Sequence, residues 1–156
     1  MTDRWLLKTE PNVYSLDDLE TEVDKTTLWD GVRNYQARNF LRDQIQVGHL
    51  ALWYHSNDKP PHVAGIVEVV RSGYPDPSQF NKRSKYFDPK ATKDNPIWFC
   101  VDVRFVERFT RPLPLQMLRD DTALDGLELN RKGSRLSVQP VSRTHFNRVC
   151  TLGRKT

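Results

Sequence analysis

The stretch Ile97–Phe109, IWFCVDVRFVERF, decides the class of fold, because apolar and polar residues alternate along it. Successive side chains of a strand point to opposite faces of the sheet. One face would carry Ile97, Phe99, Val101, Val103 and Phe105, and the other Trp98, Cys100, Asp102 and Arg104. The pattern predicts a long strand with one face packed on a core.

Four further segments have the composition of strands. Val63–Val70 is short and rich in β-branched residues, which predicts a central strand. His49–His55 alternates, so that Leu50, Leu52 and Tyr54 face away from Ala51, Trp53 and His55. Arg4–Lys8 and Arg135–Val138 are expected to be the first and the last strand.

Short helices are predicted between these strands. Ser15–Asp18 has the form of a capping box, and a last helix should begin at Ser142. Arg33–Asp43 and Leu113–Arg119 also have helical patterns. About five or six strands with short helices favour an α+β fold, a small, mixed, mostly antiparallel β-barrel with short flanking helices.

The composition fits one intracellular domain spanning residues 1–156. The chain has 156 residues, of which 37% are hydrophobic and 28% charged, which suffices for a single core. No apolar run is long enough for a bilayer, and residues 1–5 lack the layout of a signal peptide. The two cysteines form no CxxC pair, and a disulfide-rich secreted fold would hold more. A cytoplasmic protein is expected, or a nuclear one in a eukaryote.

The positive charge is concentrated near the C-terminus. The formal net charge is +4, yet residues 1–128 carry a net charge of −3. Beyond Glu128 there are seven basic residues and no acidic one. A one-sided basic patch is typical of a protein that binds a phosphate backbone, although a solvated basic face is the plainer interpretation. A second basic segment, Ser72–Pro96, predicts a long loop, and a loop of this length is uncommon unless it is functional or disordered.

The segment Trp29–Asn39, WDGVRNYQARN, combines flat rings with forked polar groups. Rings stack on flat ligands, and Arg, Asn and Gln bind hydrogen-bonding edges or phosphates. The mixture indicates a nucleobase site. A helix start with Trp29 as a core anchor is the alternative.

Several unusual motifs follow one another in a characteristic order: WLLKTEP (5–11), WDGVRNYQARN (29–39), LWYHSN (52–57), YPDP (74–77), YFDP (86–89), WFCVDVRF (98–105) and RLSVQPV (135–141). In these motifs the chain resembles the EVE domain family over nearly its whole length. The resemblance implies a PUA-like β-barrel, similar to the YTH domains that hold a methylated adenine in an aromatic cage. It also implies nucleic-acid binding through a pocket for a modified base. The family's first motif commonly reads KSEP, so Thr9 adds a methyl group and predicts a tighter pocket.

Twelve residues are predicted to bind the ligand, in three groups. Rings that could stack on a base come first, each worth roughly 1–3 kcal/mol: Trp29, Tyr54 and Trp98. Polar residues at the ends of strands or the start of a helix would read the base edge or meet phosphate: Lys8, Thr9, Glu10, Arg33, Asn34, His55 and Ser56. The last group alternates along one face of the predicted final strand, together with Gln139: Arg135 and Ser137. Core packing, a surface ion pair and a wet edge strand are the structural alternatives for these three groups.

Other chemistries have weaker support. His49, His55 and His62 lack the further ligand that zinc would need, and Cys100 is expected to be a core thiol, so neither a metal nor a cofactor is predicted. The favoured function is a module that binds RNA or DNA and accepts a flipped, modified base. A small hydrolase of modified nucleosides, with Lys8 and Glu10 as base and acid and Thr9 or water as nucleophile, ranks second. A peptide-binding adaptor is a third possibility, and the sequence leaves the oligomeric state open.

Overall fold

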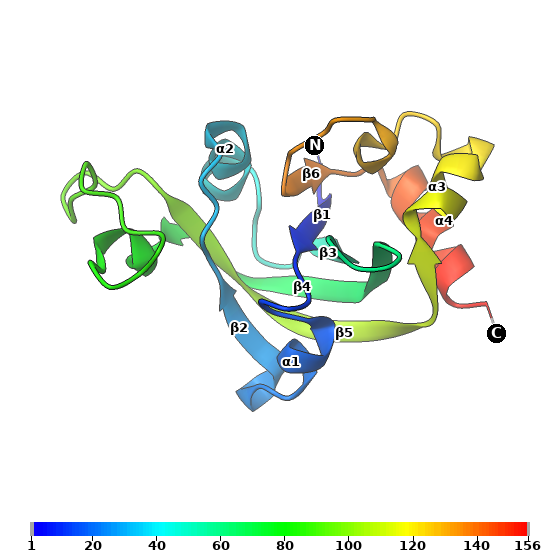
Figure 1. Ribbon diagram of the computed structural model, residues 1–156, viewed down its shortest axis with the longest axis horizontal. Helices are drawn as coiled ribbons and strands as arrows, with labels where there is room; N and C mark the ends of the chain where they lie inside the picture. Colours follow the sequence, from blue (N-terminus) through cyan, green and yellow to red (C-terminus); the bar gives the residue numbers. More distant parts are fainter. Residues whose placement is uncertain (1, 156) are drawn as a thin grey trace.

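The computed structural model describes residues 2–155, which form a curled six-stranded sheet with helices packed against its two faces (Figure 1). The strands are β1 (Arg4–Thr9), β2 (Thr26–Trp29), β3 (Leu50–His55), β4 (His62–Pro75), β5 (Phe99–Pro114) and β6 (Val138–Pro140). The α-helices are α1 (Leu16–Glu20), α2 (Tyr35–Asp43), α3 (Leu115–Asp120) and α4 (Arg143–Gly153). Short 3-10 helices lie at Val23–Lys25, Pro77–Phe80, Thr122–Leu124 and Glu128–Asn130.

The sheet has the order β2-β5-β4-β3-β1-β6. β1 and β3 run parallel, and the other pairs are antiparallel. The mixed, mostly antiparallel α+β architecture is therefore confirmed, and Val63–Val70 lies within the central strand β4. The expected closed barrel is wrong, because the outer strands β2 and β6 pair only with β5 and β1 among the described residues.

Two apolar clusters cover the two faces of the sheet, as the alternation in β3 predicted. Ala51 and Trp53 belong to the first cluster, with α1 and α2, whereas Leu52 and Tyr54 belong to the second, with α3 and α4. On β5, Val101 and Val103 join the first cluster. β5 pairs with β4 through four register shifts, and such irregularities increase strand twist and bending. The curl of the sheet in Figure 1 follows from them.

The local signals for helix starts are confirmed. Ser15 and Asp18 form the capping box at α1, and Ser142 caps α4 by accepting a hydrogen bond from the His145 N–H. Asn34 caps α2 through its Oδ1, so the helix begins two residues after the predicted Arg33. In each case a side chain satisfies a backbone N–H that has no partner within the helix.

The predicted last strand is wrong in position. The strand covers Val138–Pro140, so Arg135 and Ser137 lie before it in irregular structure. Gln139, expected to share a polar face with them, is fully buried and donates to the Leu136 carbonyl (3.0 Å). The strand makes only three residue pairs, all with β1, so the position of the chain after Ser137 depends on this tertiary pairing.

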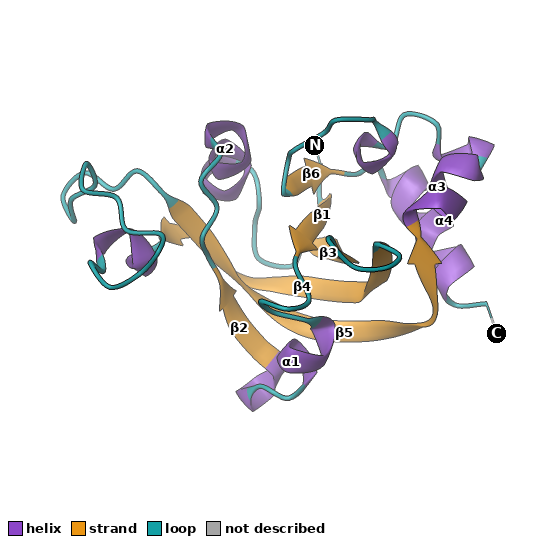
Figure 2. Ribbon diagram, in the orientation of Figure 1, coloured by secondary structure: helices purple, strands orange, loops and turns teal. Residues whose placement is uncertain are grey.

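The long basic loop is shorter than predicted, since β4 continues to Pro75. Residues 76–98 leave the sheet at one end, the green segment at the left of Figure 1, and are mostly loop with one 3-10 helix (Figure 2). Gln79 anchors this excursion: its amide donates to the Trp98 carbonyl (2.7 Å) and accepts from the Trp98 N–H (2.8 Å). No helix within residues 2–155 is both long and apolar enough to cross a bilayer.

Candidate nucleic-acid interface

A cavity of about 550 Å³ lies where the ends of β1 and β2 meet the 76–98 excursion. Its walls come from residues 8–10 with 13–14, from 28–34, from 85–86 and from Ser137. The volume is within the roughly 300–1,000 Å³ typical of small-molecule sites. Segments far apart in the chain thus enclose one space, which is called the cavity below.

The cavity brings together seven of the twelve residues proposed from the sequence: Lys8, Thr9, Glu10, Trp29, Arg33, Asn34 and Ser137. The other five lie outside its lining: Tyr54, His55, Ser56, Trp98 and Arg135. Tyr54 is 4% exposed and packs in the second apolar cluster. The Trp98 ring lies 4.8 Å from that of Tyr35, and its Nε1 donates to Asp88 (2.8 Å).

Three aromatic residues line the cavity. Trp29 is 8% exposed, so most of its indole is part of the first cluster while the remainder faces the cavity. Trp29 is therefore a core residue whose remaining surface lines the cavity. Tyr14 and Tyr86 are further lining rings that were not among the predicted residues. The YFDP motif was the available signal for Tyr86, and no local pattern marked Tyr14.

Arg33 lies at the cavity, but its guanidinium is taken up by the protein. It donates to the Tyr86 carbonyl (2.7 Å), to Asp76 (3.1 Å) and to the Ser78 hydroxyl (3.1 Å). Its Cζ also stands 5.2 Å from the Trp98 ring centre. These contacts join the wall at 28–34 to the excursion, so Arg33 holds the Tyr86 segment in place.

Asp76 is a buried acidic residue that accepts hydrogen bonds from this wall. It is fully buried and accepts from the Gly31 N–H (2.9 Å), from Arg33 and from the Ser78 N–H (2.8 Å). A buried charge is tolerated only when it is paired and hydrogen-bonded. Asp76 thus fixes the turn that follows β2.

Gly31 allows Tyr86 to lie against this turn. Its φ is +81°, which side chains rarely adopt. A Cβ built at Gly31 would stand 2.7 Å from the Tyr86 ring. The glycine is therefore required both for the turn and for the position of the ring.

Asn34 and Asp30 each present to the cavity a polar group that has no side-chain partner among residues 2–155. The Asn34 Oδ1 is used by the Ala37 N–H (2.9 Å), which leaves the Nδ2 as an unused donor. The Asp30 carboxylate accepts no hydrogen bond from another described residue. Burial, then the nearby Asp76, raises the pKa of Asp30, and Arg33 opposes the shift. Asp30 was not among the predicted residues.

The Lys8–Glu10 segment is bonded in a way that does not favour the hydrolase. The Thr9 hydroxyl donates to the Tyr14 carbonyl (2.9 Å). Lys8 Nζ donates to the Ser134 carbonyl (3.3 Å), and burial lowers the pKa of Lys8. Glu10 is exposed and accepts from Asn57 (2.9 Å). No described base accepts the Thr9 proton, so the nucleophile lacks the activation that acyl or glycosyl transfer needs.

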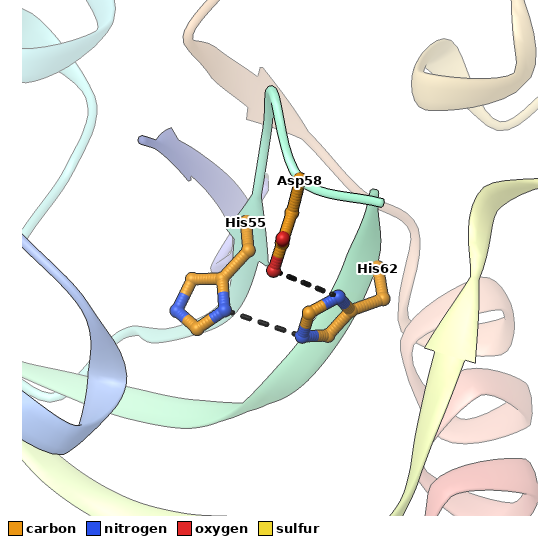
Figure 3. A group of neighbouring side chains, drawn as sticks. All are labelled: His55, Asp58 and His62. Atoms are coloured by element: carbon orange, nitrogen blue, oxygen red, sulfur yellow. Dashed lines mark hydrogen bonds and ion pairs between the residues drawn. The ribbon is translucent and has the colours of Figure 1, made fainter. Parts of the chain in front are cut away.

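A second hollow of about 300 Å³, the histidine hollow, contains His55, His62 and Asp58 (Figure 3). The Leu16 N–H donates to His55 Nε2 (3.1 Å), so the ring proton of neutral His55 is on Nδ1 and points at His62 Nε2, 3.2 Å away. His62 Nδ1 then donates to the Pro60 carbonyl (3.0 Å).

These three residues have the composition of a metal site, which the sequence did not predict. An ion between the two histidines would need both of the nitrogens that face each other, and these nitrogens are hydrogen-bonded to one another at 3.2 Å. A metal-bound histidine normally donates from its other nitrogen, whereas His55 accepts there. The hydrogen bonds therefore favour a structural pair, and burial, then His62, lowers the pKa of His55.

The basic residues near the C-terminus are largely paired within the chain. Arg143 pairs with Asp3, Arg148 with Asp121 and Arg154 with Glu107. They belong to α4 or follow it, and α4 packs on the second cluster, away from the cavity. The predicted phosphate-binding patch is thus partly neutralised, and of the basic residues in the 80–96 segment Lys85 lines the cavity.

Both cysteines are buried and free, as expected for core thiols. Burial raises the pKa of Cys100 to about 12. A thiol nucleophile needs a lowered pKa, so Cys100 is unsuited to catalysis.

The sheet and this cavity define a small α+β domain with an aromatic and polar pocket. The EVE domain family model matches residues 3–152, and the chain belongs to that family. Human thymocyte nuclear protein 1 is 40% identical over 171 residues, which cover 99% of this chain and 76% of that protein.

Solved structures agree with this assignment. A Pseudomonas syringae protein superposes with a TM-score of 0.90 at 41% identity, covering 96% of this chain and 99% of that one. A Leishmania major protein gives 0.90 at 46% identity, covering 98% and 95%. The human THYN1 protein, crystallised in complex with DNA containing 5-methylcytosine, gives 0.90 at 39% identity, covering 98% of both chains.

Proposed function

We propose that this protein binds DNA and accepts a modified base, 5-methylcytosine, in the cavity between residues 28–34 and Tyr86. The observation that carries the proposal is a base-sized space with three aromatic walls and unused polar groups. The complex of the human THYN1 protein with 5-methylcytosine DNA supports the choice of ligand. An aromatic ring gains roughly 1–3 kcal/mol for each base that stacks on it.

The ligand-binding residues of this proposal differ in part from those expected. Trp29, Tyr86 and Tyr14 form the aromatic walls, while Lys8, Asn34 and Ser137 offer polar groups. Basic residues of the 80–96 segment would meet the phosphates: Lys82, Arg83, Lys85, Lys90 and Lys93. A base must leave its stack to enter such a space, which is easiest in a single strand or at a weakened pair.

Family membership supports two finer statements. The curled sheet would be an open form of the PUA-like barrel. Because the human relative is named a nuclear protein, the protein would act in the nucleus of a eukaryotic cell and otherwise in the cytoplasm.

The direct test compares Tyr86→Ala with Tyr35→Ala. Tyr35 is 58% exposed and outside the cavity, so it is a matched control. Tyr86→Ala keeps the backbone carbonyl that Arg33 holds. By fluorescence anisotropy, Tyr86→Ala should weaken binding to a 5-methylcytosine oligonucleotide by about tenfold, and Tyr35→Ala should change it little. Equal losses, or no wild-type preference for 5-methylcytosine over cytosine, would contradict the proposal.

A further inference from the structure

The proposed pocket must distinguish 5-methylcytosine from thymine, and the 5-methyl group cannot provide this distinction. Thymine carries the same 5-methyl group as 5-methylcytosine, and the two bases differ only at position 4 and at the adjacent ring nitrogen. Cytosine presents an amino donor at position 4, whereas thymine presents a carbonyl acceptor. A cavity that recognised only shape and the methyl group would also bind the thymines of unmodified DNA.

We infer that Asp30 determines the specificity of the cavity by accepting a hydrogen bond from the 4-amino group of cytosine-type bases and rejecting the 4-carbonyl of thymine. This inference rests on the proposed function and names the residue that reads the base. Acidic side chains accept from the cytosine amino group in known base recognition.

The position of Asp30 supports this role. It directly follows Trp29, whose indole forms one wall, and precedes Gly31, whose turn is fixed by Asp76. A residue between two such fixed neighbours is preorganised, so little entropy is lost when it binds. Asp30 therefore contributes a polar group to a cavity wall that does not need to move.

The state of its carboxylate supports the same role. The side chain is open to solvent, yet protein surrounds it closely enough that burial raises its pKa. Among the described residues no side chain or neighbouring N–H bonds to it, and Arg33, the nearby cation, is directed at Asp76, Ser78 and Tyr86. Apart from its own backbone N–H, the carboxylate therefore has acceptor positions that a ligand amino group can use.

The other carboxylates near the cavity are unsuited to this task. Asp76 is fully buried and its oxygens are occupied by Gly31, Arg33 and Ser78. Glu10 is exposed and bonded to Asn57. A carboxylate has no donor when it is ionised, so Asp30 can only accept and repels the 4-carbonyl oxygen of thymine.

The experiment uses four single-stranded oligonucleotides that differ at one base: cytosine, 5-methylcytosine, uracil or thymine. They separate the effect of the methyl group from that of the 4-amino group, and single strands remove the cost of unpairing. The wild type should prefer 5-methylcytosine over thymine by at least about tenfold, the size expected for one good contact to a base. Asp30→Asn supplies both a donor and an acceptor, so it should reduce this ratio by about tenfold.

Ratios within one variant cancel the general gain in DNA affinity that follows from removing a negative charge. Asp43→Asn is the matched control, because it removes an exposed carboxylate outside the lining of the cavity and should keep the wild-type ratio. A thermal melt confirms that Asp30→Asn is folded, as expected for a side chain without hydrogen bonds to other residues.

The outcomes separate this inference from the proposed function. Equal wild-type binding of 5-methylcytosine and thymine, or an unchanged ratio in Asp30→Asn, overturns the role of Asp30. Equal binding of 5-methylcytosine and cytosine overturns recognition of the methyl group, while the ratio of cytosine to uracil still tests Asp30.

Discussion

The cavity and the histidine hollow contain similar polar side chains, but they differ in how many of these groups already have partners. In the histidine hollow, His55 and His62 form a continuous chain of hydrogen bonds from the Leu16 N–H to the Pro60 carbonyl. In the cavity, the Asp30 carboxylate accepts no hydrogen bond from another described residue, and the Asn34 Nδ2 donates none to one. Groups that the fold leaves unsatisfied are the ones available to a ligand, and residue type alone does not reveal them.

The largest effect is expected from a change at Asp76, the buried carboxylate that supports the cavity wall at residues 28–34. Asp76→Ala leaves the Gly31 N–H, Arg33 and Ser78 without their shared acceptor. Breaking a buried ion pair by removing one partner costs about 3 kcal/mol or more. Urea denaturation should show this loss in the free energy of unfolding.

Asp43→Ala is the matched control for that change. It removes a carboxylate whose pair with Arg42 is exposed to solvent, so stability should change little. An Asp76→Ala protein as stable as Asp43→Ala would mean that the cavity wall does not depend on the buried carboxylate.

An intermediate effect is expected from Gly31→Ala, which acts on the position of Tyr86. Gly133 has nearly the same φ, +80° against +81°, but open space around it. Both Gly31→Ala and Gly133→Ala should cost about 1 kcal/mol for the left-handed backbone. Only Gly31→Ala should also displace the Tyr86 ring and weaken binding to the 5-methylcytosine oligonucleotide, measured by anisotropy. Equal affinities for the two variants would show that the ring is not part of the site.

The smallest expected effect is a dependence of the free energy of unfolding on pH that arises in the histidine hollow. Burial, then His62, lowers the pKa of His55, while Asp58 and Asp17 oppose the shift and Arg108 adds to it. The unfolded chain takes up a proton near pH 6.5, whereas the folded protein does so only at lower pH. The free energy of unfolding should therefore fall as the pH drops below about 6.5 and level off below the folded pKa.

Denaturation series across this range, compared with His55→Gln, measure the contribution. The variant should lose part of the slope below about pH 6.5. The same slope in both proteins would mean that the hollow does not hold His55 in its neutral form.

The sequence predicted most of the fold, because its signals were local. Alternation in β3 and β5 and the caps at Ser15 and Ser142 depend on neighbouring residues, and all of these were confirmed. The last strand was misplaced because β6 depends on pairing with β1, more than 100 residues earlier in the chain. The prediction of a barrel failed for a similar reason, because closing the sheet depends on contacts between its outer strands.

The candidate site was predicted less completely. Residues of the WDGVRNYQARN motif do line the cavity, because a continuous segment forms that wall. Tyr14 and Tyr86 were missed as wall residues, because the fold brings them there from other parts of the chain. Asp30 was not predicted, because the sequence does not show that its carboxylate accepts no hydrogen bond from another described residue.

Because of the way the 76–98 excursion is attached, its exposed turns can change independently of the cavity. Its anchors include the bonds of Gln79 to Trp98, of Arg33 to the Tyr86 carbonyl and of Trp98 Nε1 to Asp88. The stretches between them, 81–85 and 89–95, are mostly exposed turns. Surface loops tolerate insertions at small entropic cost. Insertions or changes of charge in these turns that leave Lys85 in place can therefore alter the surface beside the cavity without altering its lining.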